Sequence, residues 1–95
     1  MKANVITCNS MIENGEYVGG YHELHEIRYL SGMEHLIATI DSIIKNNLLY
    51  GCEDTMLEDV VVDCDDSHAV TYIAEHCKDI FHYPNVKLSI NLMTT

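Results

Sequence analysis

The spacing of hydrophobic and polar residues along the chain first predicts a β-hairpin. Residues 4–12 are rich in β-branched side chains and predict a strand, and Asn14-Gly15 tolerates the positive φ that a two-residue hairpin turn requires. A turn centred there predicts three facing pairs: Glu13 with Glu16, Ile12 with Tyr17, and Met11 with Val18. Gly19-Gly20 permits a bulge or bend. Residues 21–30 fit a helix or a second strand, and we favour the strand because the hairpin needs a partner of similar length.

A helix over roughly 32–49 follows. Ser31 and Glu34 have the spacing of a capping box, and Gly51 is a natural end for the helix. Apolar residues then recur at helical spacing: Leu36, Ile37, Ile40, Ile43, Ile44 and Leu48. This pattern predicts an amphipathic helix with one face on the core.

The second half of the chain predicts a strand, a helix and a strand. Three consecutive valines at 60–62 indicate a strand buried on both faces, with parallel neighbours. Asp65, Asp66 or Ser67 can cap a helix over about 67–81, which ends before Pro84-Asn85. Its predicted apolar stripe is Val70, Ile73, Ala74, Cys77 and Phe81. Alternation over residues 86–92 predicts a last strand with one solvated face.

The element order is therefore ββαβαβ in a single α/β (α+β) domain over residues 1–95. Right-handed crossovers place both helices on one face of a four-stranded mixed sheet, which gives a two-layer sandwich with an open face. If that face carries apolar side chains, it needs a partner or a second copy. We expect a cytoplasmic protein, because the sequence lacks a signal-peptide pattern and a membrane-length apolar run.

Charge is the strongest functional signal in the sequence. Five Lys and Arg residues oppose fifteen Asp and Glu residues, so the formal net charge is -10. Between Lys45 and Lys78 there are eight carboxylates and no basic residue, and seven of the eight fall in residues 53–66. A protein this acidic repels nucleic acid and acidic membranes and attracts proteins that bind them. The bland alternative is a solvated acidic surface that serves solubility.

A comparison with DNA sets the scale of this charge. A 95-residue globule spans roughly 32 Å, and duplex DNA of that length carries about 19 charges. One copy therefore supplies about half the charge of DNA. Imitation of DNA needs the carboxylates on one face, or two copies aligned as a homodimer, which we expect to be joined by apolar contacts.

Candidate metal and catalytic groups have simpler explanations. Asp63, Asp65 and Asp66 follow a strand and could hold Mg²⁺, but capping the next helix accounts for them without a metal. His22 and His25 are three residues apart, whereas helical zinc motifs place two histidines four apart, and in a strand these two would face opposite sides. We predict no metal, no cofactor and no enzymatic activity.

The four cysteines are expected to be reduced and mostly buried. Cys64 with His68, and His76 with Cys77, could each supply two metal ligands, but neither has a matching second pair. A Cys/His hydrolase is possible on composition alone, and no sequence context activates a thiol.

In size, acidity, α/β patterning and Asn/Ile/Tyr/Met-rich composition, the whole chain resembles the small anti-restriction DNA-mimic proteins of T-even bacteriophages (Arn-like proteins). The resemblance rests on no motif. It implies a homodimer whose acidic surface replaces DNA on a restriction enzyme or nucleoid protein of the host, as a means of evading host defence. Anti-CRISPR proteins share this general character.

We therefore expect a DNA-mimic inhibitor that binds a host DNA-binding protein, with no direct nucleic-acid or membrane partner. Two alternatives stay open: a small metal-dependent enzyme built on the three aspartates, and an acidic adaptor, including an anti-CRISPR-type inhibitor. The predicted contact residues are Glu53, Asp54, Glu58, Asp59, Asp63, Asp65 and Asp66, with a second patch of Glu13, Glu16, Glu23 and Glu26.

Overall fold

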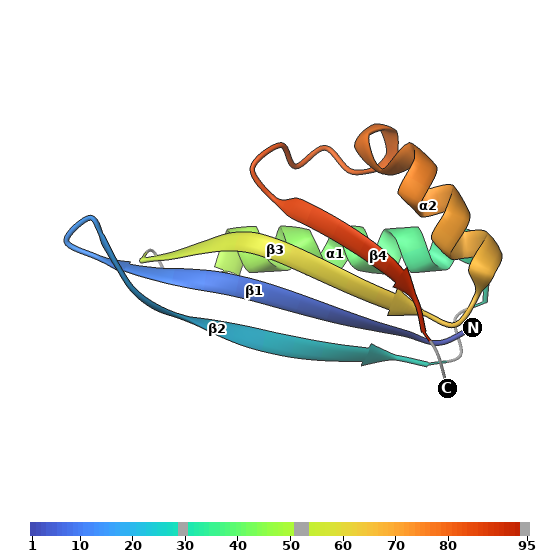
Figure 1. Ribbon diagram of the computed structural model, residues 1–95, viewed down its shortest axis with the longest axis horizontal. Helices are drawn as coiled ribbons and strands as arrows, with labels where there is room; N and C mark the ends of the chain where they lie inside the picture. The colour runs from blue at the N-terminus through green and yellow to red at the C-terminus, as the bar shows by residue number, and fades with distance from the viewer. Residues whose placement is uncertain (29–30, 51–53, 94–95) are drawn as a thin grey trace.

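A computed structural model describes residues 1–28, 31–50 and 54–93 of the chain and confirms the ββαβαβ order (Figure 1). The elements are β1 (Ala3–Glu13), β2 (Glu16–Ile27), α1 (Met33–Tyr50), β3 (Thr55–Cys64), α2 (Ser67–Ile80) and β4 (Lys87–Leu92). The ambiguous segment after the hairpin turn is a strand as far as Ile27, and Tyr29 and Leu30 lie outside the described residues.

The four strands form one mixed sheet in the order β2-β1-β3-β4. β1 runs antiparallel to both of its neighbours, whereas β3 and β4 are parallel. Both helices contribute side chains to a single core, so they cover the same face of the sheet, and α1 lies behind the sheet in Figure 1. The opposite face is open, and the fold is the predicted two-layer α+β sandwich.

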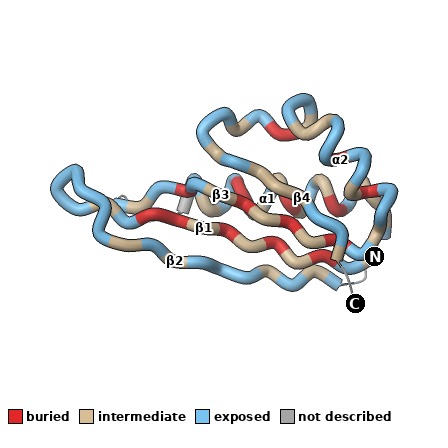
Figure 2. The backbone as a smooth tube through the Cα atoms, in the orientation of Figure 1, coloured by how far each residue is buried: buried red, intermediate tan, exposed pale blue. Residues whose placement is uncertain are grey.

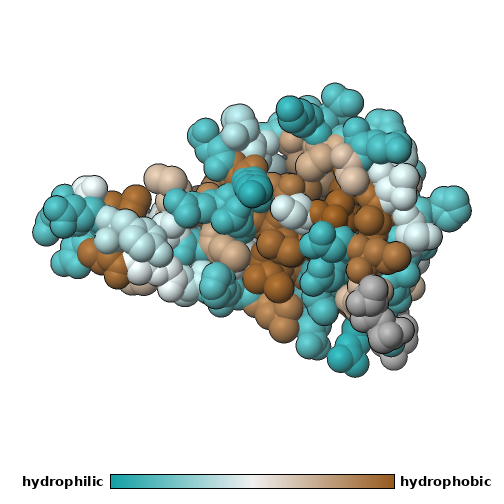
Figure 3. Space-filling view, in the orientation of Figure 1, coloured by the Kyte–Doolittle hydropathy of each residue, from teal (hydrophilic) through white to brown (hydrophobic). Residues whose placement is uncertain are grey.

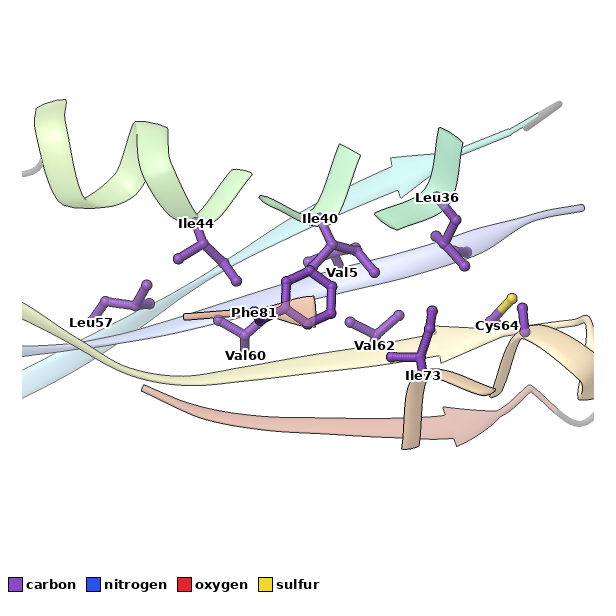
Figure 4. Close-up of a cluster of buried hydrophobic side chains, with 12 residues drawn as sticks. Val5, Leu36, Ile40, Ile44, Leu57, Val60, Val62, Cys64, Ile73 and Phe81 are labelled. Carbon is purple, nitrogen blue, oxygen red and sulfur yellow. The ribbon is translucent and has the colours of Figure 1, made fainter. Parts of the chain in front are cut away.

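The core lies between α1, α2 and the two central strands. Leu36, Ile40 and Ile44 recur on one side of α1 and point toward the sheet (Figure 4). They meet Val5 from β1 and Val60 and Val62 from β3, and all six side chains are at most 1% exposed. α2 adds its two buried residues, Ala69 and Ile73, and Phe81 follows directly after it.

The hairpin turn forms as predicted, but its register changes beyond the turn. Asn14 and Gly15 adopt φ values of 51° and 78°, and Glu13 faces Glu16. Met11 faces Gly19 and not Val18, because a bulge at Val18 adds one residue to β2. The predicted pair of Met11 with Val18 is therefore wrong.

Three local predictions need correction. α1 begins at Met33, and the amide of Leu36 donates to the carbonyl of Gly32 (3.1 Å), so Gly32 occupies the N-cap position expected for Ser31. Val61 is half-buried on the open face because the sheet has helices on one side only. Ala74, expected on the apolar stripe of α2, is exposed.

The molecule is elongated, with principal extents of 44 × 27 × 20 Å. The β1–β2 hairpin forms its narrow end in Figure 1. Within residues 1–28, 31–50 and 54–93, no helix combines the length and apolar character needed to cross a membrane.

Candidate functional site: the open sheet face and its carboxylates

β3 carries two of the predicted contact carboxylates on the open face of the sheet. Asp59 lies beside Cys8 on β1 and Lys87 on β4, and Asp63 lies beside Asn4 and Asn91 in the same way. Asn91 donates a long hydrogen bond of 3.4 Å to Asp63. Both residues are half-buried, and pairing with strands on both sides fixes their backbone positions.

Glu58 joins these two because β3 is bulged. Cys8 faces Asp59 while Asn9 faces Leu57, so Glu58 is the extra residue on β3. Leu57 and Val60 are both buried beneath the helices, and the two residues between them therefore point away from the helix layer. Glu58 is exposed there.

The aspartates at the far end of β3 have structural partners. Asp66 caps α2 by accepting a 3.1 Å hydrogen bond from the amide of Ala69, which confirms the capping prediction. Asp65 accepts a 2.8 Å hydrogen bond from the amide of Lys2, and its own amide donates to the carbonyl of Lys2. These contacts tie the N-terminus to the start of α2.

Asp54 precedes β3 at its other end. It is exposed, and its backbone carbonyl accepts a hydrogen bond from the amide of Ile12 (2.8 Å). Glu53 lies outside the described residues. The carboxylates of the described residues 54–66 therefore follow β3 from one end to the other.

The second predicted patch does not form one surface. Glu13 and Glu16 face each other at the exposed tip of the hairpin. Glu26 lies on the open face of β2, opposite Asn4, and contacts Arg28 at 3.3 Å. Glu23 lies on the helix side of the same strand and contacts His25 at 3.7 Å. These four carboxylates thus divide among the tip and the two sides of the edge strand.

The centre of the open face is apolar. Leu24, Ile6 and Val61 lie side by side across β2, β1 and β3. Leu24 is 58% exposed, and the other two are half-buried. Figure 3 shows apolar surface over the middle of the sheet, surrounded by hydrophilic side chains. The face is therefore a mixed surface, with a short apolar row between rows that carry carboxylates.

A cysteine and a histidine that the sequence did not connect meet on this face. Sγ of Cys8 lies 3.1 Å from Nδ1 of His22, on the neighbouring strand. Burial raises the pKa of the Cys8 thiol, and the negative charge of Asp59 raises it further. Asp59 flanks the cysteine on the side away from β2, where it does not orient the imidazole. A nucleophilic thiol needs the opposite electrostatics, so this arrangement does not support the hydrolase alternative.

The two groups weighed as metal ligands, His22 with His25 and the aspartates after β3, do not form a metal site among the described residues. His22 faces the open side with Cys8, whereas His25 faces the helix side with Val5, as expected for a strand. Among the residues that the structure describes, no group of three or more His, Cys, Asp or Glu side chains is arranged to hold a metal ion. The described cysteines, Cys8, Cys64 and Cys77, are free thiols, and only Cys64 is fully buried.

An open hollow of about 700 Å³ lies between the first residues of β3, the end of α1 and the segment that precedes β4. It is lined mainly by uncharged side chains, among them Leu48, Met56, Tyr83, Pro84 and Val86. Tyr83 is anchored there by donating a 2.6 Å hydrogen bond to Asp41 on α1. This hollow was not predicted, because residues from three separate segments of the chain line it.

No protein family model matches this chain, and no curated protein or solved structure matches it.

Proposed function

We propose that this protein is an acidic decoy that occupies the DNA-binding surface of a host protein, as the Arn-like proteins do. The observation that carries the proposal is the distribution of carboxylates along β3. Glu58, Asp59 and Asp63 lie on β3, a strand that spans about 33 Å, and Asp54 directly precedes it. We call these four residues the β3 acidic row.

A regular strand positions these charges more firmly than a loop would. Backbone pairing with β1 and β4 fixes Asp59 and Asp63, and the bulge turns Glu58 to the same side. Lys and Arg side chains that grip phosphates on DNA could meet these carboxylates in the same way. Such a surface accelerates association with a basic partner, and the attraction weakens as salt screens the charges.

The charge of one copy falls short of DNA. Duplex DNA as long as the 44 Å molecule carries about 26 negative charges, compared with a formal -10 for this chain. Lys87 and Arg28 also offset part of the charge beside Asp59 and Glu26. A second copy would bring the charge of the decoy closer to that of DNA. A target with a short, strongly basic groove would require less charge.

The metal-dependent alternative has less support. Asp66 is occupied as a helix cap, and Asp65 holds the amide of Lys2. Asp63 is the only member of that trio within β3, and its neighbour on each adjacent strand is an asparagine and not a second carboxylate. The geometry offers this alternative no shared ligand set.

Capture from a bacterial lysate on the immobilised protein tests the proposal. We expect proteins that bind DNA, released either by high salt or by a short duplex DNA at low salt. The β3 row variant Glu58→Gln/Asp59→Asn/Asp63→Asn should capture much less of them. Its matched control, Glu34→Gln/Glu75→Gln/Asp79→Asn, removes three exposed carboxylates from the helices and should capture as the parent does. Equal capture by both variants, or proteins that duplex DNA does not release, would contradict the proposal.

A further inference from the structure

Among the residues that the structure describes, β2 is a long edge strand that pairs with another strand on one side only. It runs from Glu16 to Ile27 at one end of the sheet order, and β1 is the strand that pairs with it. Most of its residues are exposed, in contrast to the central strands (Figure 2). An edge of this length presents unpaired backbone donors and acceptors to another strand.

The sequence of this edge is complementary to itself in the antiparallel direction. When a second copy is placed with its Leu24 opposite Leu24, His22 faces the second copy's Glu26, and Glu23 faces its His25. Tyr21 faces the second copy's Ile27 in the same register. A histidine can donate a ring N–H to a carboxylate, so all four His–Glu pairs of this arrangement are favourable.

The faces of the strand agree with this register. His22, Leu24 and Glu26 lie on the open face, opposite Cys8, Ile6 and Asn4 of β1, while Glu23 and His25 lie on the helix side. Residues that face each other in the antiparallel register therefore project on the same side of the joined sheet. Glu23 and His25 already lie 3.7 Å apart within one copy, so the His25 of each copy would lie near two carboxylates.

We propose that two copies of this chain pair through β2 about a two-fold axis at Leu24, forming a continuous eight-stranded sheet. The axis is perpendicular to the sheet, so both helix layers lie on one side and both open faces on the other. The pairing satisfies the free edge and covers part of the exposed Leu24 side chain. It does not depend on the decoy function.

Edge pairing also suits the charges better than stacking the two open faces. Face-to-face stacking would remove Asp59 and Asp63 from water, and burying these charges carries a high desolvation cost. Edge pairing leaves both β3 acidic rows exposed on the same side. The assembly then has a formal charge of -20, twice the -10 of one chain.

Two variants with the same net charge show whether dimerisation depends on the His–Glu pairs or only on the total charge of the chain. His22→Glu/His25→Glu places glutamate opposite glutamate in all four pairs and should weaken dimerisation about tenfold or more in sedimentation experiments. Ser42→Glu/His68→Glu adds the same two charges at exposed helix positions and should dimerise as the parent does. The full exchange His22→Glu/Glu23→His/His25→Glu/Glu26→His restores every His–Glu pair and should recover the dimer.

Cross-linking tests the register directly. Residues that face each other in an antiparallel pair have Cα atoms about 4.5–5.5 Å apart, which is within the range for a disulfide. Leu24→Cys should therefore form a covalent dimer under mild oxidation. Glu26→Cys is the control, because its two copies would be about 14 Å apart along the strands. The parent chain measures the background from its native cysteines.

A monomeric parent at about 100 μM would overturn the proposal. So would a dimer that the His22→Glu/His25→Glu variant leaves intact, or one that cross-links as readily through Glu26→Cys as through Leu24→Cys. Circular dichroism shows whether each variant is folded. If His22→Glu/His25→Glu does not fold, dimerisation of the full-exchange variant still tests the His–Glu pairs.

Discussion

Asn9 on β1 and Asn47 on α1 exchange two side-chain hydrogen bonds, each 2.9 Å long. Asn9 is 4% exposed, so its amide has little access to water. The reciprocal pair satisfies both amides and fixes the last turns of α1 over the central strand.

Removing one member of this pair should destabilise the fold. Asn47→Leu leaves the donor and the acceptor of Asn9 without this partner, and we expect a loss of about 1–3 kcal/mol in the free energy of unfolding. Chemical denaturation measures it. Asn46→Leu, at an exposed position on the same helix, is the control and should change the stability by less than about 0.5 kcal/mol. Equal losses in the two variants would show that the pair contributes nothing specific.

Thr7, unlike Asn9, is a buried polar residue whose side-chain hydroxyl lacks a hydrogen-bond partner among the described residues. The residue is 0% exposed. Valine has the same shape without the hydroxyl, so Thr7→Val should raise the free energy of unfolding by about 1 kcal/mol. Thr7→Ser retains the hydroxyl and loses the methyl group, and should be less stable than the parent. A destabilised valine variant would mean that the hydroxyl has a partner in solution.

Tyr83 should make stability sensitive to alkaline pH. Burial, followed by the hydrogen bond to Asp41 and its charge, raises the pKa of the Tyr83 hydroxyl to about 12. Because the folded value exceeds the usual value of about 10, this stabilisation is complete below pH 10 and is lost as the pH rises through 12. Tyr83→Phe should lower stability by about 1–3 kcal/mol at neutral pH, and the difference should shrink between pH 10 and 12. Tyr17→Phe, at an exposed position near the hairpin tip, should follow the parent throughout.

We expect no tight divalent-metal site at the β3–α2 junction. Asp66 is used as a helix cap, and Asp65 is bonded to the N-terminal segment. Calorimetric titration with Mg²⁺ or Zn²⁺ should show no micromolar binding. Such binding, lost in Asp63→Asn, would favour the enzyme alternative.

Turn chemistry and periodicity predicted the elements and their order, and the handedness of the crossovers predicted that both helices lie on one face of the sheet. The faces of β2 could not be predicted, because a bulge at Val18 shifts every later pair by one residue. A regular two-residue hairpin would place Tyr21 opposite Cys8, whereas the bulge places His22 there. A shift of one residue exchanges the two faces of a strand. The Cys8–His22 contact and the exposed position of Leu24 both result from it.

The β3 acidic row was predictable as a run of charges but not as a surface. Strict alternation from Val60 would put Leu57 on the open face, and only the bulge at Glu58 returns it to the core. The run of three valines conceals the alternation that would assign faces to Asp59 and Asp63.

The N-cap of α1 was misplaced for a local reason as well. Ser31 has the capping-box spacing, but the helix begins after Gly32, whose φ is 139°.

Competition with DNA tests the central claim most directly. A DNA-binding protein captured from the lysate is mixed with labelled duplex DNA, and the chain or a variant is added at increasing concentration at low salt. We predict that the parent and the Glu34→Gln/Glu75→Gln/Asp79→Asn control displace the duplex equally. The Glu58→Gln/Asp59→Asn/Asp63→Asn variant, shown to be folded by circular dichroism, should need at least about tenfold more protein. If the folded row variant displaces DNA as well as the parent does, the β3 acidic row is not a DNA mimic.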